Sequence, residues 1–111
     1  MPPRRRRLLK YIMDKEEVEN AINKLMSLIK PDEVTEVAFE LPHSSPDSFT
    51  MNVVFVVPDE WIKSVDEYER PLALIHFVQH IRKQIKNYLG INIVIPKGDS
   101  RIVKESDWYR I

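Results

Sequence analysis

Residues 35–57 read TEVAFELPHSSPDSFTMNVVFVV, and within them two runs alternate between apolar residues and others. Alternation of this kind is typical of strands that rest one face against a core. The segment between the runs, 42–48, is rich in proline, serine and aspartate, as connecting loops are. The stretch therefore predicts an antiparallel hairpin with strands over 35–41 and 49–57. The residues expected to face the core are Val37, Phe39, Leu41, Phe49, Met51, Val53, Phe55 and Val57.

A helix is predicted before this hairpin, over residues 14–30. Asp14 is a good N-cap residue, and Glu17 follows three positions later, as in a capping box. Pro31 ends the helix, because proline disfavours helical backbone at the residue before it. The apolar stripe of this helix is expected to contain Val18, Ala21, Ile22, Leu25, Met26, Leu28 and Ile29.

A second helix is predicted after the hairpin, over 71–89, and Gly90 is a natural residue to end it. A third strand is expected over 91–95 and is followed by a proline. The segment 97–111 is too apolar for a free tail, so part of it is expected to pack. The buried stripe of the second helix is expected to contain Leu74, Phe77, Val78, Ile81, Ile85, Tyr88 and Leu89.

The predicted order α-β-β-α-β gives an α+β fold with two helices on one face of a small three- or four-stranded sheet. If residues 8–12 form a further strand, the order becomes the split ferredoxin-like pattern, with that strand between the second and third. The sheet face away from the helices is then expected to show Val54, Val56 and Val94. Because such an apolar face is seldom left open, either the C-terminal tail or a second copy should cover it.

The chain has 111 residues, which is enough for one domain, expected over 14–111, after a basic arm over 1–13. The arm has little to bury and is expected to be disordered. The sequence contains no cysteine, which excludes disulfides, thiolate metal sites and thiol nucleophiles. No stretch is long and apolar enough for a membrane helix, and no secretory signal is evident. A cytoplasmic, non-membrane protein is expected, and abundant Glu, Lys and Arg with few Gln fits a heat-adapted source.

Charge is unevenly distributed, although the formal net charge is zero. Residues 1–10 carry five basic and no acidic groups, residues 11–75 carry five and fourteen, and residues 76–111 carry seven and three. A chain that is basic at both ends and acidic in the middle favours binding to a charged partner.

Two basic groups of residues are candidates for nucleic-acid binding. Guanidinium and ammonium groups pair with phosphates and release counterions, so a cluster of them suits a nucleic-acid backbone without specifying a sequence. The first group is the arm, with Arg4, Arg5, Arg6, Arg7 and Lys10. The second is the polar face of the second helix, with Lys83 and Lys86 among His76, Gln79, His80 and Asn87, and with Arg82 near its edge. Basic residues of the tail could extend it, namely Lys97, Arg101, Lys104 and Arg110.

From these two basic groups we predict a non-enzymatic accessory protein that binds the nucleic-acid backbone. The alternative is a self-associating or protein-binding module, such as a homodimer, that uses the acidic middle or the open valine face. No cofactor and no small-molecule substrate are expected, since Gly90 and Gly98 are the only glycines and form no phosphate-binding loop. His76 and His80 share a helix face but lack the third ligand of a catalytic zinc site.

Gln84 and Tyr88 form a Q-x-x-x-Y pair that is similar to the helical motif of the RecB-like branch of the PD-(D/E)xK nucleases. That resemblance implies a metal-dependent nuclease, whose E-x-K signature this chain lacks, because Glu60 and Lys63 are three positions apart rather than two. As a whole, the chain resembles the short, cysteine-free proteins of filamentous viruses of hot-acid archaea. This resemblance implies a viral accessory protein that acts in the host cell.

Overall fold

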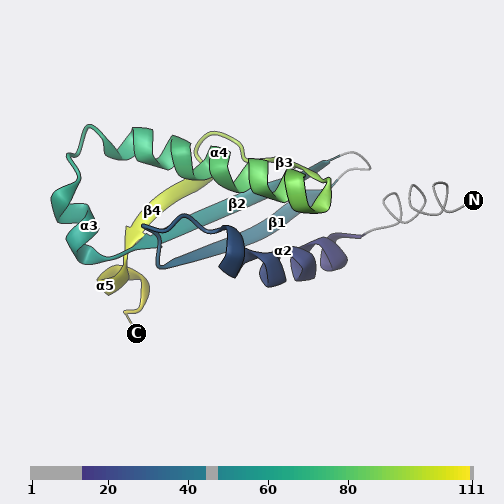
Figure 1. Ribbon diagram of the computed structural model, residues 1–111, viewed down its shortest axis with the longest axis horizontal. Helices are drawn as coiled ribbons and strands as arrows, with labels where there is room; N and C mark the ends of the chain where they lie inside the picture. The colour runs from purple at the N-terminus through teal and green to yellow at the C-terminus, as the bar shows by residue number, and fades with distance from the viewer. Residues whose placement is uncertain (1–13, 45–47, 111) are drawn as a thin grey trace, which may run out of the picture.

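The computed structural model describes residues 14–44 and 48–110. The predicted arm and the fourth strand over 8–12 lie outside these residues. The elements, in chain order, are helix α2 (Lys15–Ile29), strands β1 (Glu36–Ser44) and β2 (Ser48–Val57), helices α3 (Asp59–Ser64) and α4 (Arg70–Leu89), strands β3 (Asn92–Val94) and β4 (Ser100–Lys104), and helix α5 (Glu105–Trp108) (Figure 1).

The sheet is mixed and is built around β2. β1 pairs with one edge of β2 in antiparallel fashion, with Val37 opposite Phe55, so the predicted hairpin is confirmed. β3 and β4 both pair with the other edge of β2 and run parallel to it. A bulge between Glu40 and His43 adds one residue to β1 next to Pro42, which suits an edge strand because proline cannot donate to a ladder.

The ferredoxin-like alternative does not fit this sheet. It requires a strand between β2 and the strand after α4, but β3 pairs directly with β2. We expected the extra strand because a connection between two parallel strands often leaves room for one strand between them. Here the connection through α4 leads to β3, which lies directly beside β2. The broader prediction, an α+β fold with two helices on one face of a small sheet, is confirmed.

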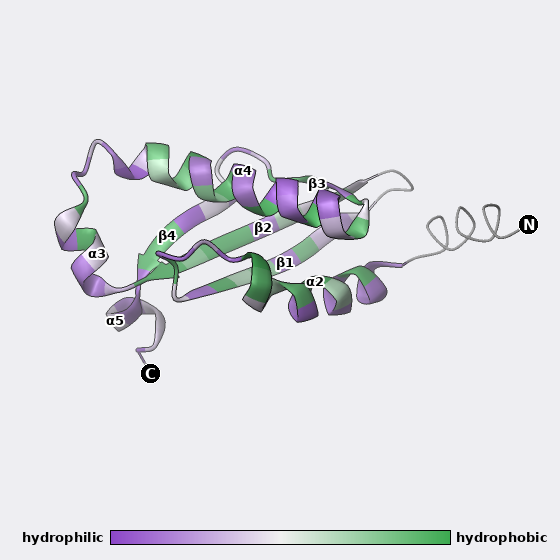
Figure 2. Ribbon diagram, viewed as in Figure 1, coloured by the Kyte–Doolittle hydropathy of each residue, from purple (hydrophilic) through white to green (hydrophobic). Residues whose placement is uncertain are grey.

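The core lies between the sheet and the helices α2 and α4, which share one side of it (Figure 1). All the predicted core residues of the hairpin lie there, and the largest fully buried ones include Phe55, Met51 and Leu41. Phe77 of α4 packs against both Phe55 of β2 and Trp61 of α3, with tilted rings whose centroids are 5.3 Å and 5.9 Å from its own. Figure 2 shows the apolar and polar residues alternating around both long helices, as their sequence pattern predicts.

The helix ends follow local chemistry. Asp14 accepts a hydrogen bond from the backbone N–H of Glu17, as the capping box predicts. Gly90 ends α4 with φ of 68°, a left-handed conformation that suits glycine. Two residues assigned to the apolar stripes are exposed instead, Leu28 at 77% and Tyr88 at 62%. Leu28 points away from the buried side of α2, and Tyr88 lies in the last turn of α4, so the stripes are narrower than the sequence predicts.

The C-terminal segment packs, as expected, but it does not cover the open sheet face as a whole. β4 extends the sheet edge, and α5 is held against the far end of the sheet by side-chain hydrogen bonds. Thr35 donates to Glu105 at 2.8 Å, and the Tyr109 hydroxyl donates to Glu36. Val56, the cross-strand partner of Glu36, is fully buried, whereas Val54 is half-buried and Val94 is exposed.

Asp59 fixes the start of α5. Its carboxylate accepts a hydrogen bond of 3.1 Å from the backbone N–H of Ser106, a group with no partner inside the helix. This hydrogen bond stabilises the ionised form and lowers the pKa of Asp59 below its ordinary value of 3.8. In the same region, the hydrogen bond to Glu36 raises the pKa of Tyr109, because the neutral phenol is the donor.

Candidate nucleic-acid interface

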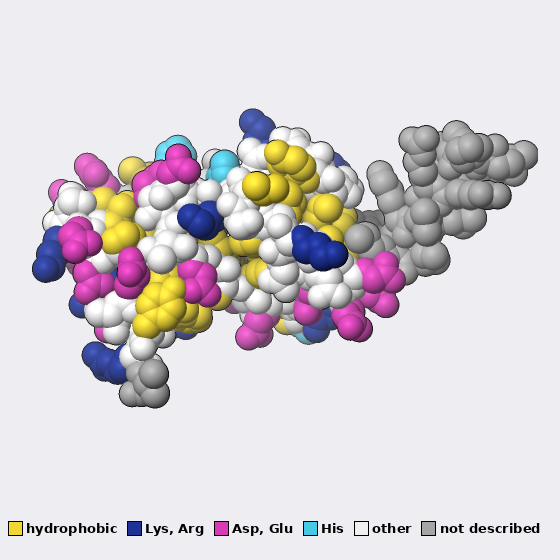
Figure 3. All heavy atoms as spheres, turned by 60° about the horizontal axis from the view of Figure 1, so that its bottom comes forward, with side chains coloured by type: hydrophobic (Ala, Val, Ile, Leu, Met, Phe, Trp, Pro, Cys, Tyr) yellow, Lys and Arg dark blue, Asp and Glu magenta, His cyan; other side chains and the backbone are white. Residues whose placement is uncertain are grey.

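Helix α4 carries no acidic residue between Arg70 and Leu89, and the chain has none from there to Gly98. Its apolar stripe rests on the sheet through Phe77, Ile81 and Ile85. Its exposed surface carries polar and basic side chains together with the apolar or aromatic Leu72, Ile75 and Tyr88. Figure 3 shows the molecule turned by 60° from the view of Figure 1, with acidic side chains at both ends of the face it presents and basic side chains among them.

A hollow lies between the C-terminal half of α4 and strand β3, with a volume of ≈ 390 Å³. We call it the basic hollow. No acidic residue of the described chain lines it, and three of the lining side chains are cationic. Its lining residues are Gln79, Arg82, Lys83, Lys86, Ile91, Asn92, Ile93 and Val94.

Two of the three cations are held against β3. The Nε of Arg82 donates to the carbonyl oxygen of Ile93 at 3.1 Å, and the Nζ of Lys86 donates to Oδ1 of Asn92 at 2.8 Å. The two Nη atoms of Arg82 make no hydrogen bond or ion pair with the described residues. Lys83 is exposed and makes no hydrogen bond or ion pair with residues 14–44 and 48–110. The hollow thus presents anchored cations with free donors, a suitable arrangement for binding an anion such as phosphate.

The predicted helix residues Arg82, Lys83 and Lys86 are therefore brought together at one site. Arg82, expected near the edge of the polar face, donates a hydrogen bond to β3 from that position. The other predicted residues, Arg4, Arg5, Arg6, Arg7 and Lys10, lie outside the residues that the structure describes.

The two histidines of α4 do not share a role. Nε2 of His80 lies 2.7 Å from the carbonyl oxygen of Ile29, so this nitrogen carries the proton and joins α4 to the end of α2. His76 is exposed. Within the described residues, no three His, Asp or Glu side chains are placed to hold a metal ion.

The basic tail residues do not extend the basic hollow as a group. Arg101 pairs in register with Val54, so its side chain lies on the sheet face opposite α4. Arg110 lies 3.7 Å from Asp107 in an exposed ion pair. The sequence could not separate these residues from the helix face, because the strand that carries Arg101 was not predicted.

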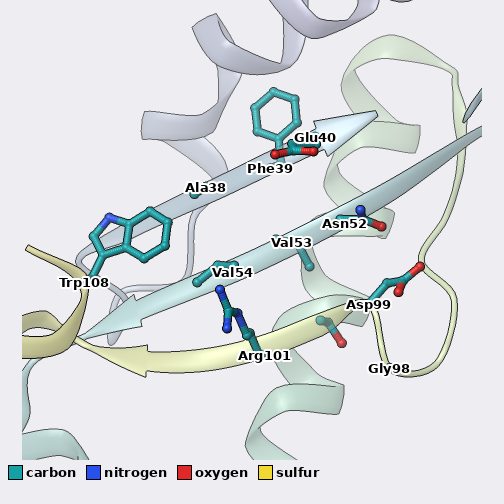
Figure 4. A pocket seen from close by; sticks show the side chains of 11 residues that line it. Ala38, Phe39, Glu40, Asn52, Val53, Val54, Gly98, Asp99, Arg101 and Trp108 are labelled. Carbon is teal, nitrogen blue, oxygen red and sulfur yellow. The ribbon is translucent and has the colours of Figure 1, made fainter. Parts of the chain in front are cut away.

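A second hollow, with a volume of ≈ 470 Å³, lies on the sheet face away from the helices. We call it the open-face hollow. Ala38 and Val54 form its floor, Trp108 stands at one end, and Arg101 lies along one side (Figure 4). Sequence reasoning missed this site. A weak signal in the sequence was the amide residue Asn52 in the middle of a strand that is mostly apolar.

The chain matches no protein-family model, no curated protein and no solved structure in the comparisons made. Among the helices of residues 14–44 and 48–110, none has both the length and the apolar character needed to cross a bilayer. The charges and contacts of the chain's own residues are therefore the basis for a proposal about its function.

Proposed function

We propose that this chain is a non-enzymatic accessory protein that binds the backbone of nucleic acids through the basic hollow and the basic arm. The observation that carries the proposal is the convergence of Arg82, Lys83 and Lys86 around one hollow that no acidic residue of the described chain lines. Arginine and lysine donors that are already positioned lose less freedom on binding, so they suit repeated phosphate contacts.

The phosphate contacts set a measurable salt dependence. Each cation that pairs with a phosphate of duplex DNA contributes about −0.9 to the slope of log affinity against log salt. Three contacts from the basic hollow therefore predict a loss of roughly 40-fold between about 50 and 200 mM salt. Five more from Arg4–Arg7 and Lys10 would raise the loss to roughly 10⁴-fold, so the slope reports which groups take part.

The experiment is fluorescence anisotropy with labelled duplex DNA, single-stranded DNA and RNA, using the full chain at several salt concentrations. The test variant carries Arg82→Gln, Lys83→Gln and Lys86→Gln. The matched control carries Lys15→Gln, Lys24→Gln and Lys63→Gln, which remove the same charge from exposed positions of α2 and α3.

On duplex DNA, the test variant is expected to lower the magnitude of the salt slope by about 2.7, and the control to change it little. A third variant with glutamine at Arg4–Arg7 is expected to lower it by about 3.6. Equal effects of the test and control variants would mean that only overall charge matters, and the basic hollow would then be no binding site. No binding of the unchanged chain at low salt would reject the proposal.

Self-association through the open valine face is the second candidate. One observation favours it, since Val94 is 46% exposed and Val54 is only half-buried. The burial of Val56 beneath the α5 end of the sheet reduces the apolar area left for a second copy. Sedimentation velocity over a range of concentrations distinguishes the two candidates, because a dimer of this face should form without nucleic acid.

A further inference from the structure

Exposed apolar side chains lie on the side of α4 that faces away from the sheet. Leu72 is 60% exposed and Ile75 is 52% exposed, and Tyr68, in the turn that precedes the helix, is 87% exposed. They follow one another at spacings of four and three residues, which places side chains on one face of a helix. Figure 1 shows no other element in front of this side of α4, so no element of the described chain covers them.

The two ends of this apolar group carry charges of opposite sign. Before it, Asp66, Glu67 and Glu69 form an acidic turn, and their exposed side chains make no ion pair with the described residues. Arg70, which follows the turn, is directed inward and donates to the carbonyl oxygen of Ile62 at 2.9 Å. After the apolar group come the three cations of the basic hollow. The exposed side of α4 therefore changes from acidic through apolar to basic along the chain.

The helix dipole explains only part of this order. Acidic side chains stabilise the N-terminal end of a helix and basic ones the C-terminal end, so the charges alone are ordinary. The dipole gives no reason for the exposed apolar residues between them. Three of the seven large exposed apolar side chains of the described chain lie in this one group. Such residues need no explanation when they are scattered singly, but gathered on an uncovered helix they indicate a binding partner.

A surface with this order of charges is complementary to its own copy in reverse. In a two-fold dimer the same patch of both copies meets, so each contact occurs twice. If two α4 helices lie antiparallel with the axis beside Ile75, positions equally far from Ile75 meet. Glu67 lies eight positions before Ile75 and Lys83 eight positions after it, so Glu67 faces the partner's Lys83. Tyr68 and Arg82, seven positions before and after, bring an aromatic ring to a guanidinium.

We propose that the exposed side of α4 binds a second copy of this chain in a two-fold, antiparallel dimer. Leu72 and Ile75 of both copies form the apolar centre. The acidic turn of each copy pairs with the cations of the other, which fixes the register. A single pair of helices buries little surface, so the dimer is expected to be transient, with a dissociation constant in the micromolar range.

This interface is separate from the open valine face, because α4 lies on the other side of the sheet. The inference does not rest on nucleic-acid binding, since the dimer forms from the chain alone. If the basic hollow also binds nucleic acid, the phosphates and the acidic turn of a second copy compete for the same cations. Each proposal can fail alone, because a neutral change of Leu72 and Ile75 removes the dimer contact and leaves every cation in place.

The first test is sedimentation velocity of the full chain without nucleic acid, up to high micromolar concentration. The unchanged chain is expected to dimerise as the concentration rises. The variant with Leu72→Ser and Ile75→Ser is expected to raise the dissociation constant by roughly thirtyfold or more, the loss typical of residues at the centre of an interface. The matched control, with Leu28→Ser and Val94→Ser, removes two exposed apolar side chains elsewhere and should leave the dimer unchanged.

The decisive test reverses the charges at each end of the interface. One variant carries Glu67→Lys and Glu69→Lys, and the other carries Lys83→Glu and Lys86→Glu. All four positions are exposed, so both variants should fold, and circular dichroism checks this. Each variant alone places like charges opposite each other and is expected to be monomeric. An equal mixture of the two is expected to form a heterodimer, because opposite charges then meet at both ends.

Two further variants control for net charge. Asp32→Lys with Glu33→Lys, and Lys15→Glu with Lys24→Glu, change the charge by the same amounts at exposed positions outside the interface. Each is expected to keep the homodimer. Measurements at about 0.15 M salt, where charges are screened beyond about 8 Å, limit attraction between oppositely charged chains that are not docked.

Three results would overturn the inference. One is an unchanged chain that stays monomeric at high micromolar concentration. Another is a mixture of the two charge-reversed variants that forms no heterodimer. The third is a dimer that is lost with Leu28→Ser and Val94→Ser but kept with Leu72→Ser and Ile75→Ser, because a different surface would then join the copies.

Discussion

The turn that opens the sheet face depends on a single glycine. Gly98 has φ of 97°, and the hydrogen bond from the Asp99 N–H to the Pro96 carbonyl closes a turn with Gly98 at its third position. This is the pattern of a type II turn, which requires positive φ at that residue. Nothing lies within 4 Å of a Cβ built on Gly98, so any cost of substitution comes from the backbone conformation and not from a clash.

The structure therefore predicts a graded series at this position. Gly98→Ala is expected to destabilise the fold by about 1 kcal/mol, since the left-handed conformation costs an L-residue roughly 1–2 kcal/mol and alanine gains part of this back by restricting the unfolded chain. Gly98→Asn should cost less, because asparagine tolerates positive φ, and Gly98→Val should cost more. For a domain of this size, 1 kcal/mol corresponds to a fall in Tm of roughly 4–8 °C.

Urea unfolding followed by circular dichroism measures the series, with Lys97→Ala as the matched control. Lys97 occupies the second position of the same turn, is exposed and has no need for positive φ, so its change should lie within about 0.5 kcal/mol. Equal stability of the glycine, asparagine, alanine and valine proteins would refute the turn geometry. The interruption between β3 and β4, and with it the open-face hollow, would then need a different physical cause.

The remaining predictions concern the buried side chain of Phe77 and the hydrogen bond of Asp59 at the start of α5. Phe77→Ala is expected to cost about 3–5 kcal/mol in the free energy of unfolding, because Phe77 is buried and loses both ring contacts, and urea unfolding measures it. Because the pKa of Asp59 is lowered in the folded chain, its contribution to stability is present above pH 3.8 and is lost as the pH falls through its folded value. Asp59→Asn should therefore be less stable than the unchanged chain at pH 7, and the difference should shrink below about pH 4. A difference that does not change between pH 7 and pH 2.5 would contradict the role of the Asp59–Ser106 hydrogen bond.

Much of the fold could be predicted because each long element has its own periodicity. The alternation in 35–57 predicted that Val37, Phe55 and the other apolar residues in phase with them face the core. The structure confirms that each of these predicted residues packs in the core. The helical stripes were predicted too wide, because Leu28 points away from the buried side of α2 and Tyr88 lies in the last turn of α4, where the side chain is exposed. The direct pairing of β2 with β3 was not predicted, because strand order depends on the whole chain.

The candidate sites differ in how much of each could be predicted from the sequence. Lys83 and Lys86 share a helix face by spacing alone, so their neighbourhood was predictable. The place of Arg82 depends on β3, whose Ile93 carbonyl accepts its hydrogen bond. Asn52 and Trp108 are far apart in the sequence, and only the fold brings them to one hollow.

The position of Arg101 depends on the number of residues in the interruption between β3 and β4. From Thr50 to Val53 the chain advances three residues, whereas from Val94 to Ser100 it advances six, so the edge strand contains three extra residues. Side chains alternate with a period of two, and an odd insertion therefore reverses which residues face the core. In an uninterrupted strand in the register of Val94, Ile102 would lie on the open face and Arg101 beneath the helices. Because of the interruption, Ile102 packs against the core instead. Arg101, which has no ion-pair partner among the described residues, lies beside Val54 on the sheet face away from α4. The same three extra residues thus create the hollow and bring Arg101 to its side, so the alternation of the sequence could show neither the hollow nor the position of Arg101.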